Sequence, residues 1–565
     1  MKLSLAYLCL FTLLISASCK KGFLDPNPTD RLSEENVWSS PSLIEGLLID
    51  NYKCLSDGFN NNFGIYNDNQ MLASLSDEVV SVYEGYEGRI IFMNGQLNAD
   101  NVESALFNKL GWRNQYYYVA RANEFLNRIN DVTVLTDDLK KTFTGEMKML
   151  RAYRYFNLLK HFGGVPLIDK PYTLGSDYKS IKRSSIEETL NFILRDLDDA
   201  ISLLPADAVN IGRINKSVAQ ALKSRVLLYA ASPLFNTTNN GARWGEAAAA
   251  AKAVIDGGRY SLEMNLEKYR LMFVTYDPSS PEIIFAKETT ILSSPEYGSF
   301  ELNPPVSHGT TGAGGLSYFT PSQQMVDAYE MSNGKPITDG TSGYNSQDPY
   351  KNRDPRFYAF IYYHGAKLNN RALDYSVGGT DRQFAVYGNP TGYNMRKFIN
   401  ETRFNADATA ISNVFVNEAT PWIHIRYAEM LLNYAEAINE AEGPAKAFEP
   451  INLIRRRAGM PDLPGTLSQS DMRQRIRNER RIELAFEEHR YWDVRRWKIA
   501  EETGNITVNG IKITKNTNGT NTFEVVPAEG PDIVNERIFL PHQYFWPIMR
   551  SEILANPNIE QNPGY

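Results

Sequence analysis

Cysteine is scarce in this chain of 565 residues, which contains three: Cys9, Cys19 and Cys54. A disulfide-rich scaffold and a metal cluster held by thiolates both require more cysteines than this. The sequence therefore excludes the small secreted folds that depend on several disulfides. With 42% hydrophobic residues, it predicts a folded protein held together by an apolar core.

Long blocks of like charge are also missing. Lys and Arg total 59 against 66 Asp and Glu, which gives a net charge of −7, and the two signs are interspersed. Binding to a phosphate backbone requires a concentrated positive surface. We therefore expect no nucleic-acid partner.

Long hydrophobic runs are absent after residue 18, so no segment of the mature chain is predicted to span a bilayer. Residues 1–18 join Lys2 to a short apolar run that ends in small residues, which is the pattern of a cleaved signal peptide. Cys19 follows, and the site resembles a bacterial lipobox with Ser16 in place of the usual leucine. We predict lipid attachment at Cys19; an ordinary secretory signal beside an incidental cysteine is the alternative.

Recognisable catalytic and metal-binding motifs are lacking as well. The six histidines are dispersed without an H-E-x-x-H pair, and no G-x-S-x-G sequence marks a nucleophilic serine. Glycoside hydrolysis needs two carboxylates about 5–10 Å apart, and no pair stands out among the 66 acidic residues. We therefore predict that the protein is not an enzyme and uses neither a metal nor a cofactor.

The chain does contain clear helical periodicity. Ser185 and Glu188 form a capping box that predicts the start of a helix, and Pro205 ends it. Successive helices pair into units of roughly 34–40 residues with small residues at facing positions, which is typical of tetratricopeptide-like repeats. The predicted helices include 113–130, 139–161, 186–204, 216–232, 244–257, 428–438 and 445–458.

The segment 290–400 has a different texture. It holds 13 of the 38 glycines, turn sequences such as Asn333-Gly334, and little helical periodicity. We predict a mainly α fold: a tetratricopeptide-like α/α helical-repeat scaffold with a loop-rich, short-stranded excursion at 290–400. Long irregular segments on a rigid scaffold are common binding surfaces.

Several motifs, in this order, resemble the SusD/RagB family over essentially the whole chain. They are EMKMLRAYRYF at 146–156, FGGVPL at 162–167, RYAE at 426–429, YAEA at 434–437, NERRIELAFE at 478–487, WDVRRW at 492–497 and QNPGY at 561–565. The resemblance implies an outer-membrane lipoprotein of Bacteroidetes type that faces the cell exterior. It also implies a partner: a SusC-like TonB-dependent transporter, over which such proteins act as a substrate-binding lid.

We predict the following division of the chain, in which the two large regions follow from the resemblance. After the signal peptide at 1–18 comes a tether at 19–36, then a SusD-like N-terminal helical region at 37–260 and a RagB/SusD C-terminal region at 261–565. Helices within 424–500 are expected to pack on the N-terminal region.

The charged and aromatic residues of the family motifs fit a structural role. Acidic and basic residues three or four positions apart on a helix near 471–490 are expected to pair on a solvated or half-buried face: Asp471 with Arg475, Arg475 with Glu479, and Arg480 with Glu483. Aromatic residues in or beside helices are expected to pack in the core: Trp112, Tyr116 to Tyr118, Trp492 and Trp497.

Sugar recognition sets the criteria for a candidate site. Aromatic rings cover the apolar C–H faces of a sugar, and Asn or Arg side chains take its hydroxyl groups. The resemblance assigns no ligand contact, so candidates are chosen for an aromatic or polar side chain in irregular surroundings. They are Tyr83, Tyr86, Arg89, Asn94, Tyr297 and Tyr318.

The leading functional prediction is non-catalytic capture of oligosaccharide or polysaccharide nutrients and their delivery to the transporter. Capture of peptides, suggested by the RagB side of the family, is a close alternative. A surface glycoside hydrolase and a purely structural helical adaptor are the other two.

Overall fold

The computed structural model describes residues 34–56, 58, 71–81, 87–102, 110–172, 175–208, 210–288, 317, 319–368, 371–382, 388–399, 401, 420–530 and 533–565. Within these ranges the chain is mainly helical, with short two-stranded sheets. This confirms the predicted fold class.

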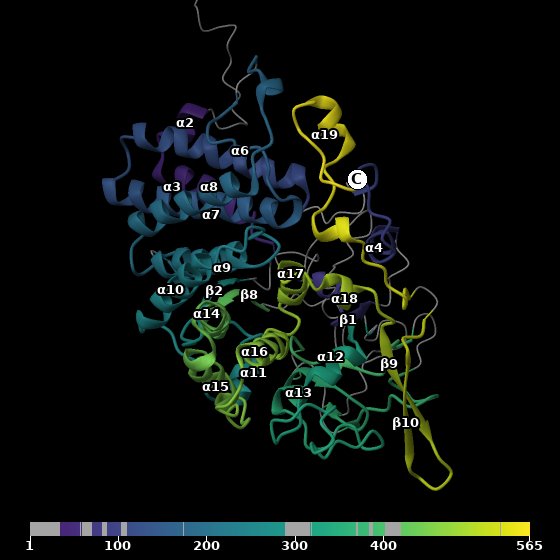
Figure 1. Ribbon diagram of the computed structural model, residues 1–565. Coiled ribbons are helices and arrows are strands. Elements are labelled where there is room, and N and C mark those ends of the chain that lie inside the picture. The colour runs from purple at the N-terminus through teal and green to yellow at the C-terminus, as the bar shows by residue number, and fades with distance from the viewer. Residues whose placement is uncertain are drawn as a thin grey trace, which may run out of the picture.

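The N-terminal part is a stack of antiparallel helices (Figure 1). Neighbours along the chain pack on one another, α6 on α7, α7 on α8, α8 on α9 and α9 on α10. The stacked helices are α2 (Glu34–Trp38), α3 (Pro41–Tyr52), α6 (Trp112–Arg128), α7 (Asp137–Phe162), α8 (Ile186–Leu203), α9 (Lys216–Ala231) and α10 (Ala242–Asp256). Two short helices, α4 (Glu87–Met93) and α11 (Leu266–Leu271), lie outside the stack.

Local sequence signals fix the ends of these helices. The Ser185 hydroxyl accepts a hydrogen bond from the backbone amide of Glu188, and the Glu188 carboxylate accepts one from the backbone amide of Ser185. The predicted capping box is therefore present. Helix α7 ends at Gly163, whose φ of +75° lies in the left-handed region that glycine adopts at little cost. Gly164 allows the close approach of residue 184, because a Cβ there would lie 2.1 Å from the Ser184 carbonyl oxygen. These signals explain why the predicted helix bounds agree with the structure within a few residues.

Three C-terminal helices continue the same stack: α14 (Tyr427–Glu442), α15 (Phe448–Arg457) and α16 (Gln469–Glu483). Shorter helices follow outside it: α17 (His489–Arg496), α18 (Ala500–Gly504) and α19 (Arg550–Ala555). Helix α14 packs on α10, which belongs to the N-terminal part of the chain, and α16 packs on α14. Ala247 and Ala251 on α10 and Ala428 and Ala435 on α14 are fully buried or nearly so, which lets the two helices approach closely.

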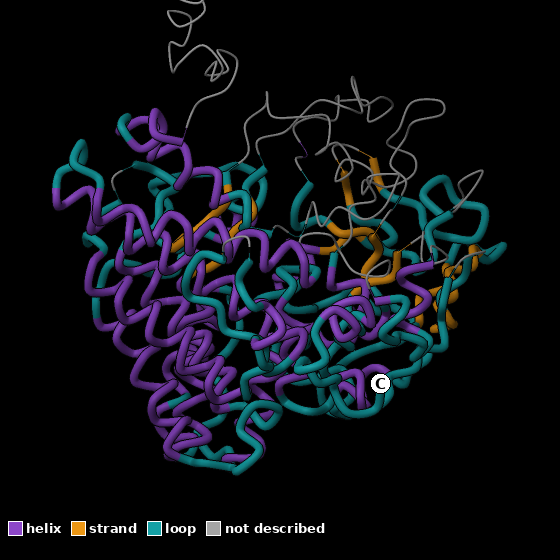
Figure 2. Tube along the Cα trace, turned by 90° about the horizontal axis from the view of Figure 1, so that it is seen from above, coloured by secondary structure: helices purple, strands orange, loops and turns teal. Residues whose placement is uncertain are grey.

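Short strands and two short helices make up most of the remaining structure, and apart from the strand pair that packs on α9 they lie to one side of the helical stack (Figure 2). The antiparallel pairs are β1 (Val79–Ser81) with β3 (Phe319–Pro321), β2 (Ile283–Lys287) with β8 (Trp422–Arg426), β4 (Ile361–Tyr362) with β7 (Asn394–Met395), β5 (Lys367–Leu368) with β6 (Arg371–Ala372), and β9 (Asn509–Lys515) with β10 (Asn521–Pro527). Helices α12 (Gln323–Ala328) and α13 (Pro355–Phe360) lie among them. The described part of 290–400 is therefore short-stranded, as predicted.

The core has three main apolar clusters. One joins α6, α7, α8 and α9, a second joins α9, α10, α14, α15 and α16, and a third fills the short-stranded region around Phe357, Phe360 and Tyr375. Trp112, Trp492 and Trp497 are 4%, 7% and 4% exposed, which confirms that they are core residues. The prediction is wrong for Tyr117, which is 54% exposed.

Candidate functional site

Two short strands from distant parts of the chain pair with each other, and each adjoins a sequence segment that contains candidate residues. In the β1–β3 pair, Val79 lies opposite Pro321 and Ser81 lies opposite Phe319. The strands are antiparallel, so the chain that follows Ser81 and the chain that precedes Phe319 leave the same end of the pair. We call this the loop-bearing end.

Side chains from other elements fix the strand pair in place. The Thr320 hydroxyl donates to the Val80 carbonyl oxygen at 3.1 Å, and the Ser322 hydroxyl donates to that of Asp77 at 2.6 Å. From the C-terminal part of the chain, the Arg537 guanidinium donates to the carbonyl oxygen of Val79 at 3.2 Å and to that of Ser76. The loop-bearing end therefore rests on a well-bonded base.

Two buried carboxyl groups lie just before β1, and their pKa values are shifted in opposite directions. Asp77 accepts hydrogen bonds from Arg490 at 2.8 and 2.9 Å and pairs with Arg481 at 2.9 Å. Burial alone would raise the pKa of Asp77, but the two guanidinium groups outweigh it and hold that pKa well below its usual range. Burial instead raises the pKa of Glu78 to about 8.

Sequence reasoning missed these supporting residues because their partners are remote. Arg490 is 413 positions from Asp77. The only local signal was the acidic pair itself, next to a short β-branched stretch at 79–80.

Most of the candidate ligand contacts lie outside the described residues: Tyr83, Tyr86, Tyr297 and Tyr318. The same is true of Cys19, the predicted site of lipid attachment. Arg89 is part of α4, of which only the backbone is described at that position. Asn94 follows α4 and is half-buried; its amide donates to the Ile90 carbonyl oxygen at 2.8 Å, and it forms a parallel bridge with Ile538. The structure therefore places Asn94, and it leaves the grouping of the tyrosines a prediction.

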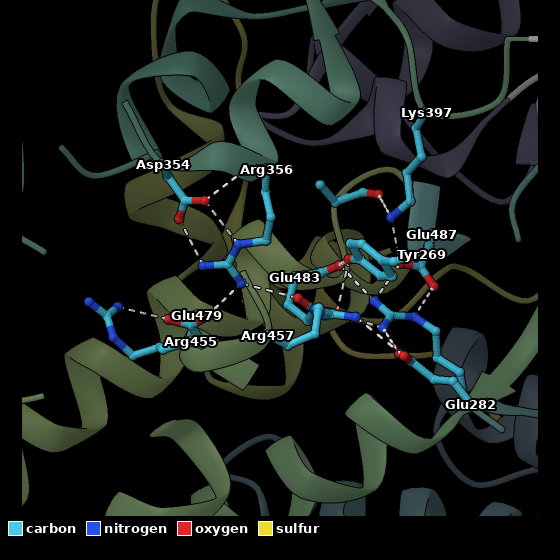
Figure 3. A network of polar contacts seen from close by, with 12 residues as sticks. Tyr269, Glu282, Asp354, Arg356, Lys397, Arg455, Arg457, Glu479, Glu483 and Glu487 are labelled. Carbon is cyan, nitrogen blue, oxygen red and sulfur yellow. Dashed lines mark hydrogen bonds and ion pairs between the residues drawn. The ribbon is translucent and has the colours of Figure 1, made fainter. Parts of the chain in front are cut away.

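The strongest family motif, on α16, forms the buried ion network shown in Figure 3. The Glu483 carboxylate accepts from Arg426 at 2.6 Å, from Arg356 at 3.1 Å and from Arg457, and all four side chains are at most 1% exposed. These three cations hold the pKa of Glu483 well below its usual range despite its burial.

The network extends to both sides of Glu483. Glu479 pairs with Arg356 at 2.6 Å and with Arg455 at 3.1 Å, while Glu487 pairs with Lys397 at 2.6 Å and with Arg426 at 2.8 Å. Burial lowers the pKa of Lys397 to about 8 although Glu487 opposes that change. The charges of the motif therefore join α16 to the short-stranded region.

The predicted local pairs on α16 are wrong. Arg475 pairs with Glu330 at 3.0 Å, and Arg480 pairs with Asp493 at 3.2 Å. Their partners come from other elements because the charged face of α16 is buried rather than solvated. The structural role predicted for the motif is confirmed by this burial.

Across the residues that the structure describes, no group of three or more His, Cys, Asp or Glu side chains is placed to hold a metal ion. Nor does any helix in these ranges have the length and apolar character needed to cross a membrane. Cys54 is a buried free thiol, and burial raises its pKa, which disfavours the thiolate that a nucleophile requires.

Comparison with known proteins covers nearly the whole chain. The model of the SusD family matches residues 281–565, and the model described as "Starch-binding associating with outer membrane" matches residues 22–228. SusD-like protein P38 of Formosa agariphila is 23% identical over 593 residues, which span 100% of this chain and 99% of that relative.

Solved structures share the fold. A SusD-like protein of Bacteroides fragilis is 31% identical with a TM-score of 0.78, over 96% of this chain and 100% of the other. A SusD-like carbohydrate-binding protein of the same species is 26% identical with a TM-score of 0.73, over 93% of this chain and 100% of the other.

Proposed function

The chain belongs to the SusD family, and from that premise we propose that it captures glycans at the outer membrane and delivers them to a SusC-like TonB-dependent transporter. The observation that carries the proposal is the match of residues 22–228 to a family described as starch-binding and associated with the outer membrane. The 26% identical protein described as carbohydrate-binding supports the same ligand class.

The glycan site proposed here is the loop-bearing end. Tyr318 directly precedes Phe319, and Tyr83 follows Ser81 by two positions. Because Ser81 and Phe319 are paired, we propose that both tyrosines contribute to one site. Asn94 and Arg89 belong to the segment around α4, which packs beside the residues leading into β1. Aromatic rings from two distant segments could then line one site, with amide and guanidinium groups at its edge.

The proposed anchor is a lipid on Cys19, followed by the tether at 19–36. Lipid chains on one N-terminal residue would hold the protein at the membrane surface without a spanning segment. The division into 37–260 and 261–565 stays a prediction. Because α14 packs on α10, we propose that the two parts act as one rigid binding unit.

We propose that binding occurs without catalysis. A glycosidase needs a protonated carboxylic acid beside the substrate. Glu78 has a raised pKa of about 8 but is 1% exposed, so a bound glycan would not reach it. The buried carboxylates on α16 are paired with arginine or lysine side chains, which suits support rather than proton transfer.

The proposal is tested by calorimetric titration of the detergent-solubilised full chain. The panel contains plant, host and microbial polysaccharides, their oligosaccharides, and mixed peptides. Saturable binding of one glycan class without product formation is expected. Binding of peptides alone would move the assignment to peptide capture, and release of reducing ends would overturn the non-catalytic role.

Variants then locate the site. Tyr83→Ala and Tyr297→Ala are expected to weaken glycan binding about tenfold each, because each removes one stacked ring. The matched controls Tyr83→Phe and Tyr297→Phe keep the ring and are expected to bind as the wild type does. Unchanged binding in an alanine variant would remove that tyrosine from the site.

Anchoring and delivery have separate tests. Cys19→Ser is expected to release the protein from the membrane fraction while glycan affinity in solution is unchanged. The wild-type protein is expected to co-purify with a TonB-dependent transporter from outer membranes. A Cys19→Ser protein that stays in the membrane fraction would argue against the lipid anchor.

A further inference from the structure

A hollow lies along the outer face of α6, at the surface of the helical stack. Its volume is about 1330 Å³. One wall is α6 itself; the other walls come from residues 166–181 and from α19 with the residues that follow it. We call it the α6 groove. In Figure 1, α6 and α19 lie at the top of the molecule and β1 lies well below them.

The α6 groove collects the exposed aromatic side chains of the molecule. Over the described ranges, the aromatic side chains that are largely exposed are Tyr117, Tyr172 and Tyr178, at 54%, 47% and 53%. All three line the α6 groove. The remaining aromatic residues in these ranges are buried or half-buried. A random scatter of surface tyrosines would not gather in one hollow, so the arrangement points to a ligand.

The floor and walls of the α6 groove are fixed before any ligand arrives. Trp112 is buried at the floor, and the Tyr116 hydroxyl beside it donates to the Pro166 carbonyl oxygen at 2.7 Å. Asn556 donates to the carbonyl oxygens of Tyr178 and Ile181 at 3.0 and 2.9 Å, which ties the tyrosine-bearing loop to the segment after α19. Little conformational entropy is therefore lost on binding.

Polar groups lie between the exposed rings. The Arg121 guanidinium donates to the Tyr117 hydroxyl at 3.2 Å and is held by Asp50 at 2.7 Å, so it is oriented toward the groove's tyrosine. Glu124 and Asn127 also line the groove from the same face of α6. Aromatic rings that alternate with hydrogen-bonding groups suit the mixed surface of a sugar, whose ring faces are apolar and whose edges carry hydroxyl groups.

We propose that the α6 groove is a second carbohydrate-binding site, separate from the loop-bearing end, for a linear oligosaccharide. Its volume exceeds the roughly 300–1,000 Å³ of a typical small-ligand pocket, which favours several linked sugars over a single one. The ligand class rests on the proposed function. The second site adds to it, because two sites on one chain hold a polysaccharide with an avidity that neither reaches alone.

The test uses the detergent-solubilised full chain with Tyr83→Ala and Tyr297→Ala as background, so that binding at the loop-bearing end is weakened. The probes are maltohexaose, laminarihexaose and a uronic-acid hexasaccharide. Hydrogen exchange is followed in peptides that cover α6 and residues 166–181. At least one probe is expected to protect these peptides and to bind saturably.

Groove variants are then added to that background. Tyr117→Ala and Tyr172→Ala are each expected to weaken the remaining affinity about tenfold and to abolish the protection. The matched controls Tyr117→Phe and Tyr172→Phe keep the ring and are expected to stay close to the parent affinity. Ile211→Ala, at an exposed apolar residue outside the groove, controls for general surface effects.

Two results would overturn the proposal. One is that no probe protects α6 and residues 166–181. The other is that the alanine variants bind like their parent, or lose only co-purification with the transporter, which would make the groove a protein contact. The two sites fail separately: effects from Tyr83 and Tyr297 alone leave glycan capture standing without the α6 groove, and effects from Tyr117 and Tyr172 alone leave glycan capture to the α6 groove and remove the loop-bearing end. If no probe binds at either site, the proposed function fails as well.

Discussion

Helix α16 buries charged side chains, whereas α6 exposes an aromatic side chain. On α16, Arg480 and Glu483 are 1% and 0% exposed, in the middle of the molecule. On α6, Tyr117 is 54% exposed and lines the α6 groove. A rule that puts charged side chains outside and aromatic rings inside is wrong for these residues of the two helices, although Trp112 on α6 follows it.

The two helices differ in what their side chains contact. Each buried carboxylate of α16 meets guanidinium groups from other elements, which offsets the cost of leaving water. The exposed rings of α6 and its neighbouring loop face solvent, where a flat apolar surface serves binding better than folding. Buried charge thus supports the fold of this protein, and the exposed tyrosines line the groove that we propose as a second site.

The largest expected effect comes from breaking the α16 network. Glu483→Gln leaves Arg356, Arg426 and Arg457 buried without their shared carboxylate, and we expect it to lower the free energy of unfolding by about 3–5 kcal/mol. Denaturant unfolding followed by circular dichroism measures the change. A loss below about 1 kcal/mol would mean that the network relaxes easily and does not support the fold.

The next largest effect is expected from a pair of substitutions in α6. Trp112→Ala removes a buried ring and is expected to cost at least about 3 kcal/mol of stability, whereas Tyr117→Ala removes an exposed ring and is expected to cost well under about 1 kcal/mol. Thermal unfolding of both variants checks the pair. Equal losses would show that Tyr117 is packed in the folded protein.

The neighbours Glu78 and Asp77 sharpen the comparison through pH. Burial raises the pKa of Glu78 from its ordinary value of 4.5 to about 8, so the folded protein keeps a proton that the unfolded chain loses between these values. Glu78 therefore lowers stability increasingly as the pH rises from about 4.5 to 8. Glu78→Gln is expected to raise the free energy of unfolding by about 3–4 kcal/mol at pH 8 and to change it little at pH 4.5.

The control for that prediction is Asp77→Asn. The pKa of Asp77 is depressed by Arg481 and Arg490, so its stabilising effect is present above its ordinary value of 3.8 and is lost as the pH falls through the depressed pKa. Asp77→Asn is expected to destabilise the protein near neutral pH. If both substitutions shifted stability in the same direction, the opposite environments assigned to the two carboxyl groups would be wrong.

The smallest effect is expected at an exposed ion pair. Arg456 pairs with Glu449 at 3.0 Å and with Asp462, and all three side chains are largely exposed. Water and salt screen such pairs, so Glu449→Gln is expected to leave the melting temperature within experimental error. A clear loss, comparable to that of Glu483→Gln, would remove the distinction between buried and exposed charge.

An element could be predicted from the sequence when the residues that fix it lie next to it in the chain. Helix α8 was predictable because its capping box and Pro205 lie at its own ends. The strand pair β1–β3 was not, because each strand has three residues and the partner lies about 240 positions away. The same holds for the partners of Glu483, which come from three other segments of the chain.

The α6 groove was missed for a different reason. Tyr116, Tyr117 and Tyr118 were read together as core residues, yet a helix turns about 100° per residue, which sets Tyr117 about 140° from Trp112. Trp112, Gln115, Val119 and Asn123 mark the buried face of α6, so a helical wheel alone would have turned Tyr117 outward. The loop tyrosines Tyr172 and Tyr178 carry no such local signal, because tertiary hydrogen bonds of Asn556 position their segment.

The β1–β3 pair also constrains the order in which the parts of the protein can fold. Contacts across about 240 positions give a high contact order, and closing so large a loop slows folding. Arg537 and Arg490 must also be in place before β1 is fully held. A chain synthesised from its N-terminus therefore cannot complete the β1–β3 pair and its supports until residue 537 is available, so this part of the molecule is the last to be fixed.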